Sequence, residues 1–228
     1  MLKIENTEVY GWEAAIRGMR NPMNSWEQSD SGSCETWDCT DCGYYKLIPD
    51  FHCGDTEQFA IGPKDLGLML SLRKAGTDHR KFMRMITVSC DVVAPLYWWK
   101  EYDTYKVGTV ANSCSTMHKI HEKELTLDDF SHEHLDDWSL NTLERVIGLM
   151  NFNRKALLDT KDKTHWWQMI QLLPTSYNQR RTIMLNYEVL TNIYKSRRTH
   201  KLDEWHTFCE WIETLPYFEL IKGGADNG

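Results

Sequence analysis

One segment of the chain has the clear pattern of a β-strand, and its place among helical segments constrains the fold most. Residues 83–95 (MRMITVSCDVVAP) alternate in polarity and are rich in β-branched side chains, which is typical of a strand. Helical patterns occupy residues 9–20, 62–76, 96–106, 139–158, 164–173, 181–198 and about 203–214. An early helix, a strand and several further helices predict an α+β fold in which helices dominate.

The 228 residues suffice for one sizeable core, and no internal repeat or low-complexity linker divides them. Residues 21–60 stand out because they are rich in Asn, Ser, Asp and Gly and hold four of the seven cysteines. This composition is typical of a long loop or an inserted hairpin, and such loops are more often functional than idle. We therefore predict a single domain over residues 1–228 with a cysteine-rich inserted loop at about 21–60.

The formal net charge of -7 limits the classes of partner. A nucleic-acid polymer needs a basic protein surface, so we do not expect one, whereas a small phosphate ligand needs only a few local cations. No apolar run reaches the length that spans a membrane, and Lys3, Glu5 and Glu8 interrupt the first stretch of the chain. We expect a soluble cytoplasmic protein without membrane contact.

The cysteines of the inserted loop allow two interpretations. Cys34, Cys39, Cys42 and Cys53 follow the pattern C-x4-C-x2-C-x10-C. Four thiolates can close a tetrahedral zinc site, and the C-x2-C half has a suitable spacing. The other spacings are irregular, and a cytosolic chain keeps its thiols reduced, so a metal-free loop is the alternative to zinc.

Several familiar catalytic patterns are missing from the sequence. It has no G-x-S-x-G elbow, no G-x-G-x-x-G turn and no phosphate-binding P-loop. Four histidines lie close together in a stretch rich in Lys and Glu: His118, His121, His132 and His134. We interpret these histidines as part of a solvated face rather than as metal ligands.

The segment 181–198 carries the most informative pattern for binding. Asn186, Leu190, Ile193 and Arg197 recur at spacings of four, three and four, so they share one face of the expected helix. An Asn and an Arg on a buried stripe can hold a flat, hydrogen-bonding ligand such as a pyrimidine. The alternative is a helix whose polar ends simply reach solvent.

Two neighbouring segments carry cations and small polar side chains. Arg180 and Arg181 lie at the expected start of that helix, where free N–H groups and guanidinium groups suit an anion. The polar stretch 100–118 holds Lys100 and Lys106. It suits a phosphate or the edge of a flavin, and it suits an ordinary surface loop equally well.

Two stretches, taken together, resemble the flavin-dependent thymidylate synthases. Residues 86–119 are similar to the family's strand ending in Ala-Pro, here Ala94-Pro95, followed by an aromatic helix. Residues 173–205 are similar to its Leu-Pro turn and following helix, with matches at Leu173, Pro174, Asn186, Leu190, Asn192, Arg197 and His200. The early helix and the segment 76–82 with His79 are similar as well, so about half of the chain is matched in order.

The resemblance implies a helix-rich fold around a central mixed or antiparallel sheet, assembled as a homotetramer. It also implies FAD sites built from several subunits and methyl transfer to C5 of deoxyuridine monophosphate. Methylenetetrahydrofolate is then the carbon donor and NADPH the reductant, and no protein nucleophile is expected. With the cations above, the expected nucleotide-binding residues are Arg197, Asn186, Lys100, Glu101, Asn112, Cys114, Ser115 and Arg180. The expected cofactor-binding residues are His79, Lys106, Thr109, Asn192 and His200.

The chain departs from the family pattern at positions that bind charge. The Arg-His-Arg signature falls on Thr104-Tyr105-Lys106, and a Gln of the aromatic helix falls on Glu101. The later Glu-x-Ser-x-Arg falls on Asn112, Cys114 and Thr116. A lysine cannot reproduce the bidentate hydrogen bonds of an arginine. The alternative function is therefore a catalytically silent or substrate-switched homologue that still binds a pyrimidine nucleotide.

Overall fold

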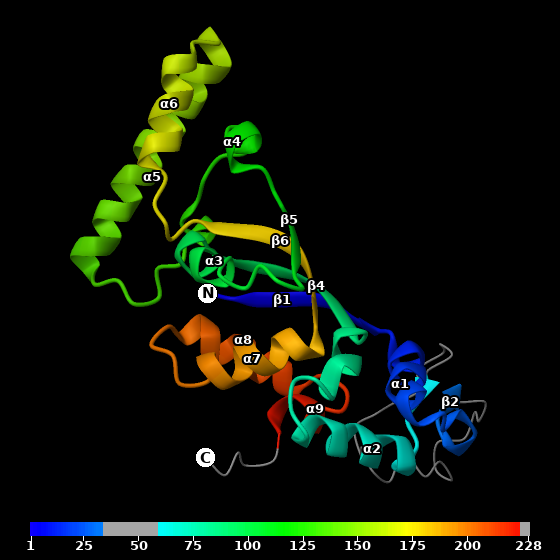
Figure 1. Ribbon diagram of the computed structural model, residues 1–228. Coiled ribbons are helices and arrows are strands. Elements are labelled where there is room, and N and C mark those ends of the chain that lie inside the picture. Colours follow the sequence, from blue (N-terminus) through cyan, green and yellow to red (C-terminus); the bar gives the residue numbers. More distant parts are fainter. Residues whose placement is uncertain (34–58, 224–228) are drawn as a thin grey trace, which may run out of the picture. The chain divides into compact units, whose positions relative to one another are not determined.

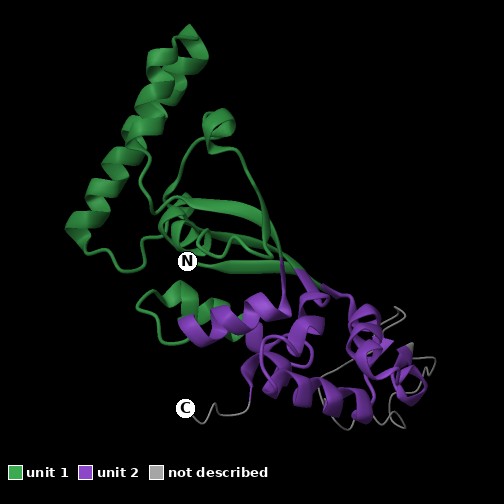
Figure 2. Cartoon of the chain, in the orientation of Figure 1, with its two compact units in different colours: residues 1–8, 89–184, 197–211 green, residues 9–88, 185–196, 212–228 purple. Residues whose placement is uncertain are grey.

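The computed structural model describes residues 1–33 and 59–223. Its contacts divide the chain into two compact units, shown in Figure 2. Unit 1 contains residues 1–8, 89–184 and 197–211, and unit 2 contains residues 9–88, 185–196 and 212–228. The single domain expected from the sequence stays a prediction. Within the described residues, no helix combines the length and the apolar character that crossing a bilayer requires.

A four-stranded sheet forms the centre of unit 1, in the order β1-β4-β6-β5 (Figure 1). The strands are β1 (Lys3–Tyr10), β4 (Thr87–Pro95), β5 (Val110–Ser113) and β6 (Asn178–Asn186). β5 and β6 pair antiparallel, from Val110 opposite Met184 to Ser113 opposite Arg181. Every second side chain of β4 is buried, which is the period expected of a strand with one face on a core. The α+β fold class is confirmed.

Helices follow the strands of unit 1. They are α3 (Leu96–Tyr102), α4 (Thr116–Lys119), α5 (Asp137–Thr160), α6 (Lys163–Leu172) and α8 (Asp203–Glu213). The carboxylates of Asp136 and Asp162 accept hydrogen bonds from backbone N–H groups and so cap α5 and α6. α5 and α6 form a hairpin that extends away from the sheet in Figure 1. Leu143, Ile147 and Met150 of α5 share a core with Met169 of α6.

Aromatic side chains fix α3 against α8. The rings of Trp98 and Trp205 lie 4.8 Å apart, and Trp98 also packs on Tyr102 and Phe208. All four side chains are almost completely buried. Such ring pairs contribute roughly 0.5–1.5 kcal/mol beyond the burial of their area. The cluster therefore gives the residues at the ends of α3 and α8 a defined position.

Unit 2 is mainly helical. It contains α1 (Trp12–Arg20), α2 (Pro63–Lys74), α9 (Glu219–Lys222) and most of α7 (Tyr187–Arg197). Short 3₁₀ turns cover Asn21–Met23, Trp26–Gln28 and Arg80–Arg84. The ring of Trp12 packs edge-on against Tyr187 and Tyr217 at 5.2 and 5.1 Å. The antiparallel pair of β2 (Gly32–Ser33) and β3 (Phe59–Ala60) brackets residues 34–58 in the sequence.

Most of the expected helices are confirmed, but the one over residues 181–198 is wrong in its first third. Residues 178–186 form β6, and the helix begins at Tyr187. The cause is burial by the sheet, since Ile183 and Leu185 alternate inward in a β-branched and apolar stretch. The expected face is corrected accordingly: Asn186 ends the strand and does not share a helical face with Arg197.

Two further expectations need correction. The loop expected over residues 100–118 contains an edge strand, β5, which pairs with β6. The early helix begins at Trp12 rather than at residue 9, because residues 3–10 are a strand and Gly11 has φ 92°. A Cβ atom at Gly11 would lie 2.0 Å from the carbonyl oxygen of Met85, so only glycine fits this junction.

Candidate functional site

Arg197 lies in a half-buried polar cluster of unit 1. Its Nη1 atom is 2.8 Å from Oε2 of Glu101, and its Nε donates a hydrogen bond of 2.9 Å to the hydroxyl of Tyr105. The guanidinium also lies over the ring of Trp205, 4.8 Å from the centroid. The side chain is 18% exposed, so it does not extend into bulk water. We call Arg197, Glu101, Tyr105, His200 and Trp205 the Arg197 cluster.

The carboxylate of Glu101 also faces a histidine. Nε2 of His200 lies 3.4 Å from Oε2 of Glu101, while Nδ1 of His200 accepts a hydrogen bond from the backbone N–H of Leu202. Because Nδ1 accepts, the ring proton of a neutral His200 is on Nε2 and faces the carboxylate. Three residues expected in the site, Arg197, Glu101 and His200, are thus brought together, and the acid offsets the charge of the guanidinium.

Three other expected residues line a groove of about 490 Å³ in unit 1. They are Cys114 and Ser115, just after β5, and Arg180 on β6. The groove is also lined by Lys3, Lys119, Lys123, Glu122, Asp128, Asp129, Tyr177 and Gln179. We call it the β5–β6 groove. It carries both cations and acids, so its affinity for an anion depends on which cations are already paired.

Arg180 is engaged by acids at the groove edge. Its Nη2 atom lies 2.7 Å from Asp91 and 3.5 Å from Glu5. Hydrogen bonds from Thr182, Arg180 and Asn6 hold the pKa of Asp91 well below its usual range. A phosphate bound by Arg180 would therefore compete with a carboxylate that stays ionised.

The lysines of the groove differ in whether an acid pairs with them. Lys119 pairs with Glu122, and Lys123 pairs with Asp129, which raises the pKa of Lys123. Lys3 makes no ion pair with any described residue. Within the described part of the chain, Lys3 is thus the groove cation most available to an incoming phosphate.

The backbone at the groove is fixed by β6. The N–H of Cys114 donates to the carbonyl of Arg180 at 3.0 Å, and the side-chain amide of Gln179 donates to the carbonyl of Cys114 at 2.9 Å. The hydroxyl of Ser115 accepts from the N–H of His118 and caps α4. The thiol of Cys114 is free and exposed.

The remaining unit 1 candidates lie around the turn between α3 and β5. Lys100, Lys106 and Asn112 are exposed, and neither ammonium group has an acid partner among the described residues. The hydroxyl of Thr109 is turned inward, where it donates to the carbonyl of Tyr105. Gly108 has φ 78°, a conformation that favours glycine and leaves the backbone open to close approach.

Three expected residues lie in unit 2. The side-chain oxygen of Asn186 accepts a hydrogen bond of 3.0 Å from the N–H of Val189 and so caps α7. Asn192 and His79 are exposed. The structure thus gives Asn186 a local role in starting a helix, and it leaves the other two side chains accessible.

The sequence reasoning missed two members of the Arg197 cluster. Tyr105 falls on the middle position of the family signature, where a histidine is usual, and it binds Arg197 through its hydroxyl. Trp205 stacks on the same guanidinium from α8. Tyr105 could have been predicted from its place in the Arg-His-Arg signature of the similar family. No periodic pattern in the sequence indicated Trp205.

The expected zinc ligands Cys34, Cys39, Cys42 and Cys53 lie outside the described residues. Among the residues that are described, no group of three or more His, Cys, Asp and Glu side chains is arranged to hold a metal ion. The four histidines at 118, 121, 132 and 134 do not converge. His132 contacts a backbone carbonyl, and His134 pairs with Asp203.

The fold places the chain in a structural class: it has the fold of the flavin-dependent thymidylate synthases. A solved structure of the flavin-dependent thymidylate synthase ThyX from Helicobacter pylori, complexed with FAD and dUMP, matches with a TM-score of 0.63 at 14% identity. The match covers 96% of each chain. A UMP/dUMP methylase, PolB from Streptomyces cacaoi, bound with 5-Br UMP, matches with a TM-score of 0.56 at 13% identity over 94% of this chain and 88% of that one. No family model and no curated protein sequence matches the chain.

Proposed function

We propose that the chain binds FAD and a pyrimidine nucleotide and transfers a one-carbon unit to C5 of deoxyuridine monophosphate. Methylenetetrahydrofolate and NADPH are the co-substrates, and the working form is a homotetramer. The observation that carries the proposal is the Arg197 cluster. A half-buried guanidinium, aligned by Glu101 and Tyr105, lies where the resemblance expects the nucleotide-binding arginine. The match of the fold to a thymidylate synthase over nearly the whole chain supports it.

The residues present fit a flavin dinucleotide at its diphosphate. The ammonium groups of Lys100 and Lys106 have no acid partner among the described residues, and Gly108, two residues after Lys106, lets the backbone approach closely. Lys106 would hold the diphosphate. When bound and reduced, FAD supplies the hydride that completes the methyl group.

The protein itself binds and orients the substrate. Arg197 donates hydrogen bonds to the pyrimidine carbonyls, and Tyr105 and Trp205 hold the guanidinium in the plane that this requires. Glu101 pairs with the guanidinium, and His200 lies against the carboxylate of Glu101. Lys3 and Arg180 line the β5–β6 groove, which is a separate candidate site for a phosphate. Because no protein nucleophile is needed, these positioning contacts are the chain's contribution to the rate.

A second candidate is a silent or substrate-switched homologue. Glu101 offsets the charge of Arg197, and Asp91 pairs with Arg180. Both guanidinium groups therefore attract an anionic nucleotide less strongly than unpaired ones would. One structural neighbour is a methylase of both UMP and dUMP, so this fold also accommodates a ribonucleotide. The two candidates share nucleotide binding and differ in whether, and on which sugar, the chemistry proceeds.

One set of measurements tests the proposal. Purified protein is examined for a flavin spectrum, and melting temperatures are recorded with FAD, dUMP and UMP, because a ligand of the native state raises stability by mass action. Tritium release from [5-³H]dUMP and [5-³H]UMP is then followed with NADPH and methylenetetrahydrofolate. Release from dUMP supports the first candidate, and release from UMP alone supports a switched substrate. Nucleotide binding without release supports a silent homologue, and a protein that binds neither FAD nor nucleotide overturns both candidates.

A further inference from the structure

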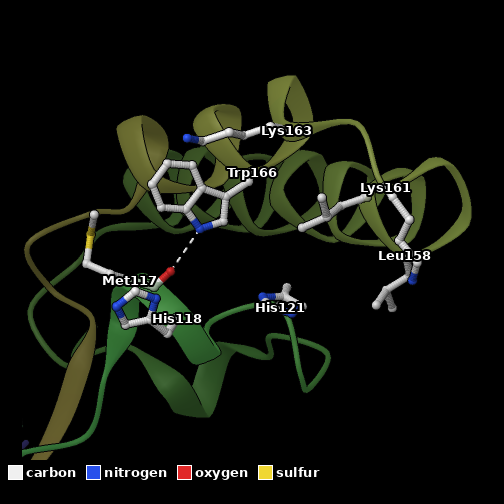
Figure 3. A pocket seen from close by; sticks show the side chains of 8 residues that line it. Met117, His118, His121, Leu158, Lys161, Lys163 and Trp166 are labelled. Carbon is white, nitrogen blue, oxygen red and sulfur yellow. Dashed lines mark hydrogen bonds between the residues drawn. The ribbon is translucent and has the colours of Figure 1, made fainter.

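A second cavity, of about 480 Å³, lies in unit 1 beside α4 and the turn between α5 and α6 (Figure 3). Its lining residues are Met117, His118, His121, Leu157, Leu158, Lys161, Lys163 and Trp166. None of them belongs to the Arg197 cluster or to the β5–β6 groove. The volume lies within the range of small-molecule sites, roughly 300–1,000 Å³. We call it the hairpin cavity.

One wall of the hairpin cavity is apolar and rigid. Met117, Leu157 and Leu158 contribute aliphatic side chains, and Trp166 contributes an indole ring (Figure 3). The indole N–H donates a hydrogen bond of 2.8 Å to the carbonyl of Met117, which ties α6 to α4 and fixes the ring. A ring fixed in this way suits a flat apolar group.

The ionisable groups that line the hairpin cavity are all basic. Lys161, Lys163, His118 and His121 line it, and no Asp or Glu does, although the chain as a whole carries a formal charge of -7. The ammonium of Lys163 lies 5.6 Å from the ring centroid of Trp166, so the cation and the aromatic wall are adjacent. A ligand that combines a ring with an anionic group would match both features.

The backbone of Lys161, one of the lining residues, is strained. This residue ends α5 in the left-handed conformation, with φ 60° and ψ 14°. Glycine or asparagine is favoured at such a position, because a longer side chain brings strain there. The strained position nevertheless carries a side chain that lines the cavity.

We propose that the hairpin cavity binds a small aromatic anion, with its ring against Trp166. Its carboxylate or phosphate pairs with the ammonium of Lys163, which lies beside that ring. This binding is independent of the nucleotide and flavin sites, because the cavity shares no residue with them.

The proposal is tested by calorimetric titration of the full chain with four probes. They are 2-naphthoate, 2-naphthyl phosphate, 2-naphthylmethanol and inorganic phosphate. Both naphthyl anions should bind, and the neutral alcohol and bare phosphate should bind at least about tenfold more weakly, since each lacks one of the two recognised groups. The preference between naphthoate and naphthyl phosphate identifies the anionic group. If the alcohol binds as tightly as the anions, or neither anion binds, the proposal is overturned.

Three variants separate binding from folding. Lys163→Gln removes the cation beside Trp166, so it should weaken naphthoate binding at least about fivefold with little change in melting temperature. Lys161→Gly relieves the left-handed strain at the other end of the cavity, so it should raise the melting temperature and weaken binding less than Lys163→Gln does. Lys155→Gln, an exposed lysine of α5 that does not line the cavity, is the matched control and should change neither. Unchanged naphthoate affinity in Lys163→Gln would overturn the assignment.

Discussion

At the scale of single residues, the ion pair of Arg197 and Glu101 is the centre of the proposed nucleotide site. The guanidinium donates to Glu101 and Tyr105 at 2.8 and 2.9 Å, which uses two of its donors and leaves others for a ligand. The acid stands where the similar family has a glutamine, so the local charge is lower by one. Glu101 still orients the guanidinium of Arg197, but the cluster should attract an anionic nucleotide less strongly than it would with a glutamine at residue 101.

The first prediction concerns Arg197 itself. Arg197→Ala should weaken dUMP binding by about 1.5–3 kcal/mol, because a charge-assisted hydrogen bond is lost. Titration calorimetry measures the change. Arg198→Ala, at the exposed neighbouring residue, is the control and should leave the affinity unchanged. An Arg197→Ala protein with wild-type affinity would remove this residue from the binding site.

The second prediction concerns its partner. Glu101→Gln keeps an oxygen that accepts from Arg197 and removes the offsetting charge, so dUMP should bind more tightly, by about 1 kcal/mol. Asp103→Asn is the matched control, because it removes an exposed acid that pairs with Arg181 instead. Weaker binding in Glu101→Gln would mean that the carboxylate itself contacts the nucleotide, and the offset argument would fail.

At the scale of elements, local patterns predicted the helices and missed most of the strands. α2, α3, α5, α6 and α8 follow from caps, breakers and apolar spacing along the sequence. β6 was predicted as helix because the helical spacing of Leu190, Ile193 and Arg197 extends back to Asn186. The burial of Ile183 and Leu185, which marks the strand, depends on neighbouring strands that a local pattern does not contain. β5 has no buried side chain at all, so its only signal is its pairing with β6.

The buried pair that joins α1 to α2 gives the third prediction. Arg20 is held by Asp65 at 2.6 Å, and both side chains are almost completely buried. Arg20→Ala should destabilise the fold by about 3–5 kcal/mol, because it leaves an unpaired buried carboxylate. Arg17→Ala breaks an exposed pair with Glu13 on the same helix and should cost at most about 0.5 kcal/mol. Urea unfolding measures both, and equal losses would contradict the burial argument.

The same carboxylate gives the fourth prediction. Burial raises the pKa of Asp65, but hydrogen bonds from Ser31, Ser29 and Arg20 outweigh burial, and the pKa lies below its ordinary value. A lowered folded-state pKa adds stability above the ordinary value, and that stability is lost as the pH falls through the folded value. The urea concentration at the unfolding midpoint should therefore decrease as the pH is lowered from about 5, through the ordinary pKa of 3.8 and on through the folded value.

Asp65→Asn is the test of this assignment. The variant cannot titrate at residue 65, so its urea midpoint should depend less on pH in that window than the midpoint of the wild-type protein. It should also be less stable at neutral pH, because the amide cannot balance the charge of buried Arg20. An unchanged pH slope would assign the acid sensitivity to other carboxylates.

At the scale of the whole molecule, the fold was predictable from the sequence and the complete site was not. Two motif stretches were enough to identify the family resemblance, and the solved thymidylate synthase matches over nearly the full chain. The motif positions, however, carry different side chains, and the partners of those side chains come from distant segments. Asp91 beside Arg180 and Trp205 beside Arg197 are examples that no local pattern encodes.

The homotetramer expected from the resemblance gives the last prediction. Trp138, Leu149 and Phe152 of α5 are 83%, 48% and 67% exposed. Leu149 and Phe152 lie about three and four turns beyond Trp138, so the three side chains share one face of the helix. Exposed apolar side chains that share a helix face are typical of association surfaces. We therefore expect the full chain to sediment as a tetramer in analytical ultracentrifugation, with this face of α5 in a subunit contact.

Charge on that face should break the contact. The double variant Trp138→Glu/Phe152→Glu should sediment as a smaller species, because association would bury two carboxylates without partners. Lys201→Glu, at an exposed residue outside α5, is the control and should sediment as the wild type does. Both side chains are exposed in the isolated chain, so the double variant should keep the melting behaviour of a folded subunit. A tetramer that survives both substitutions would place the subunit contacts on other surfaces, and a monomeric wild-type chain would contradict the expected assembly itself.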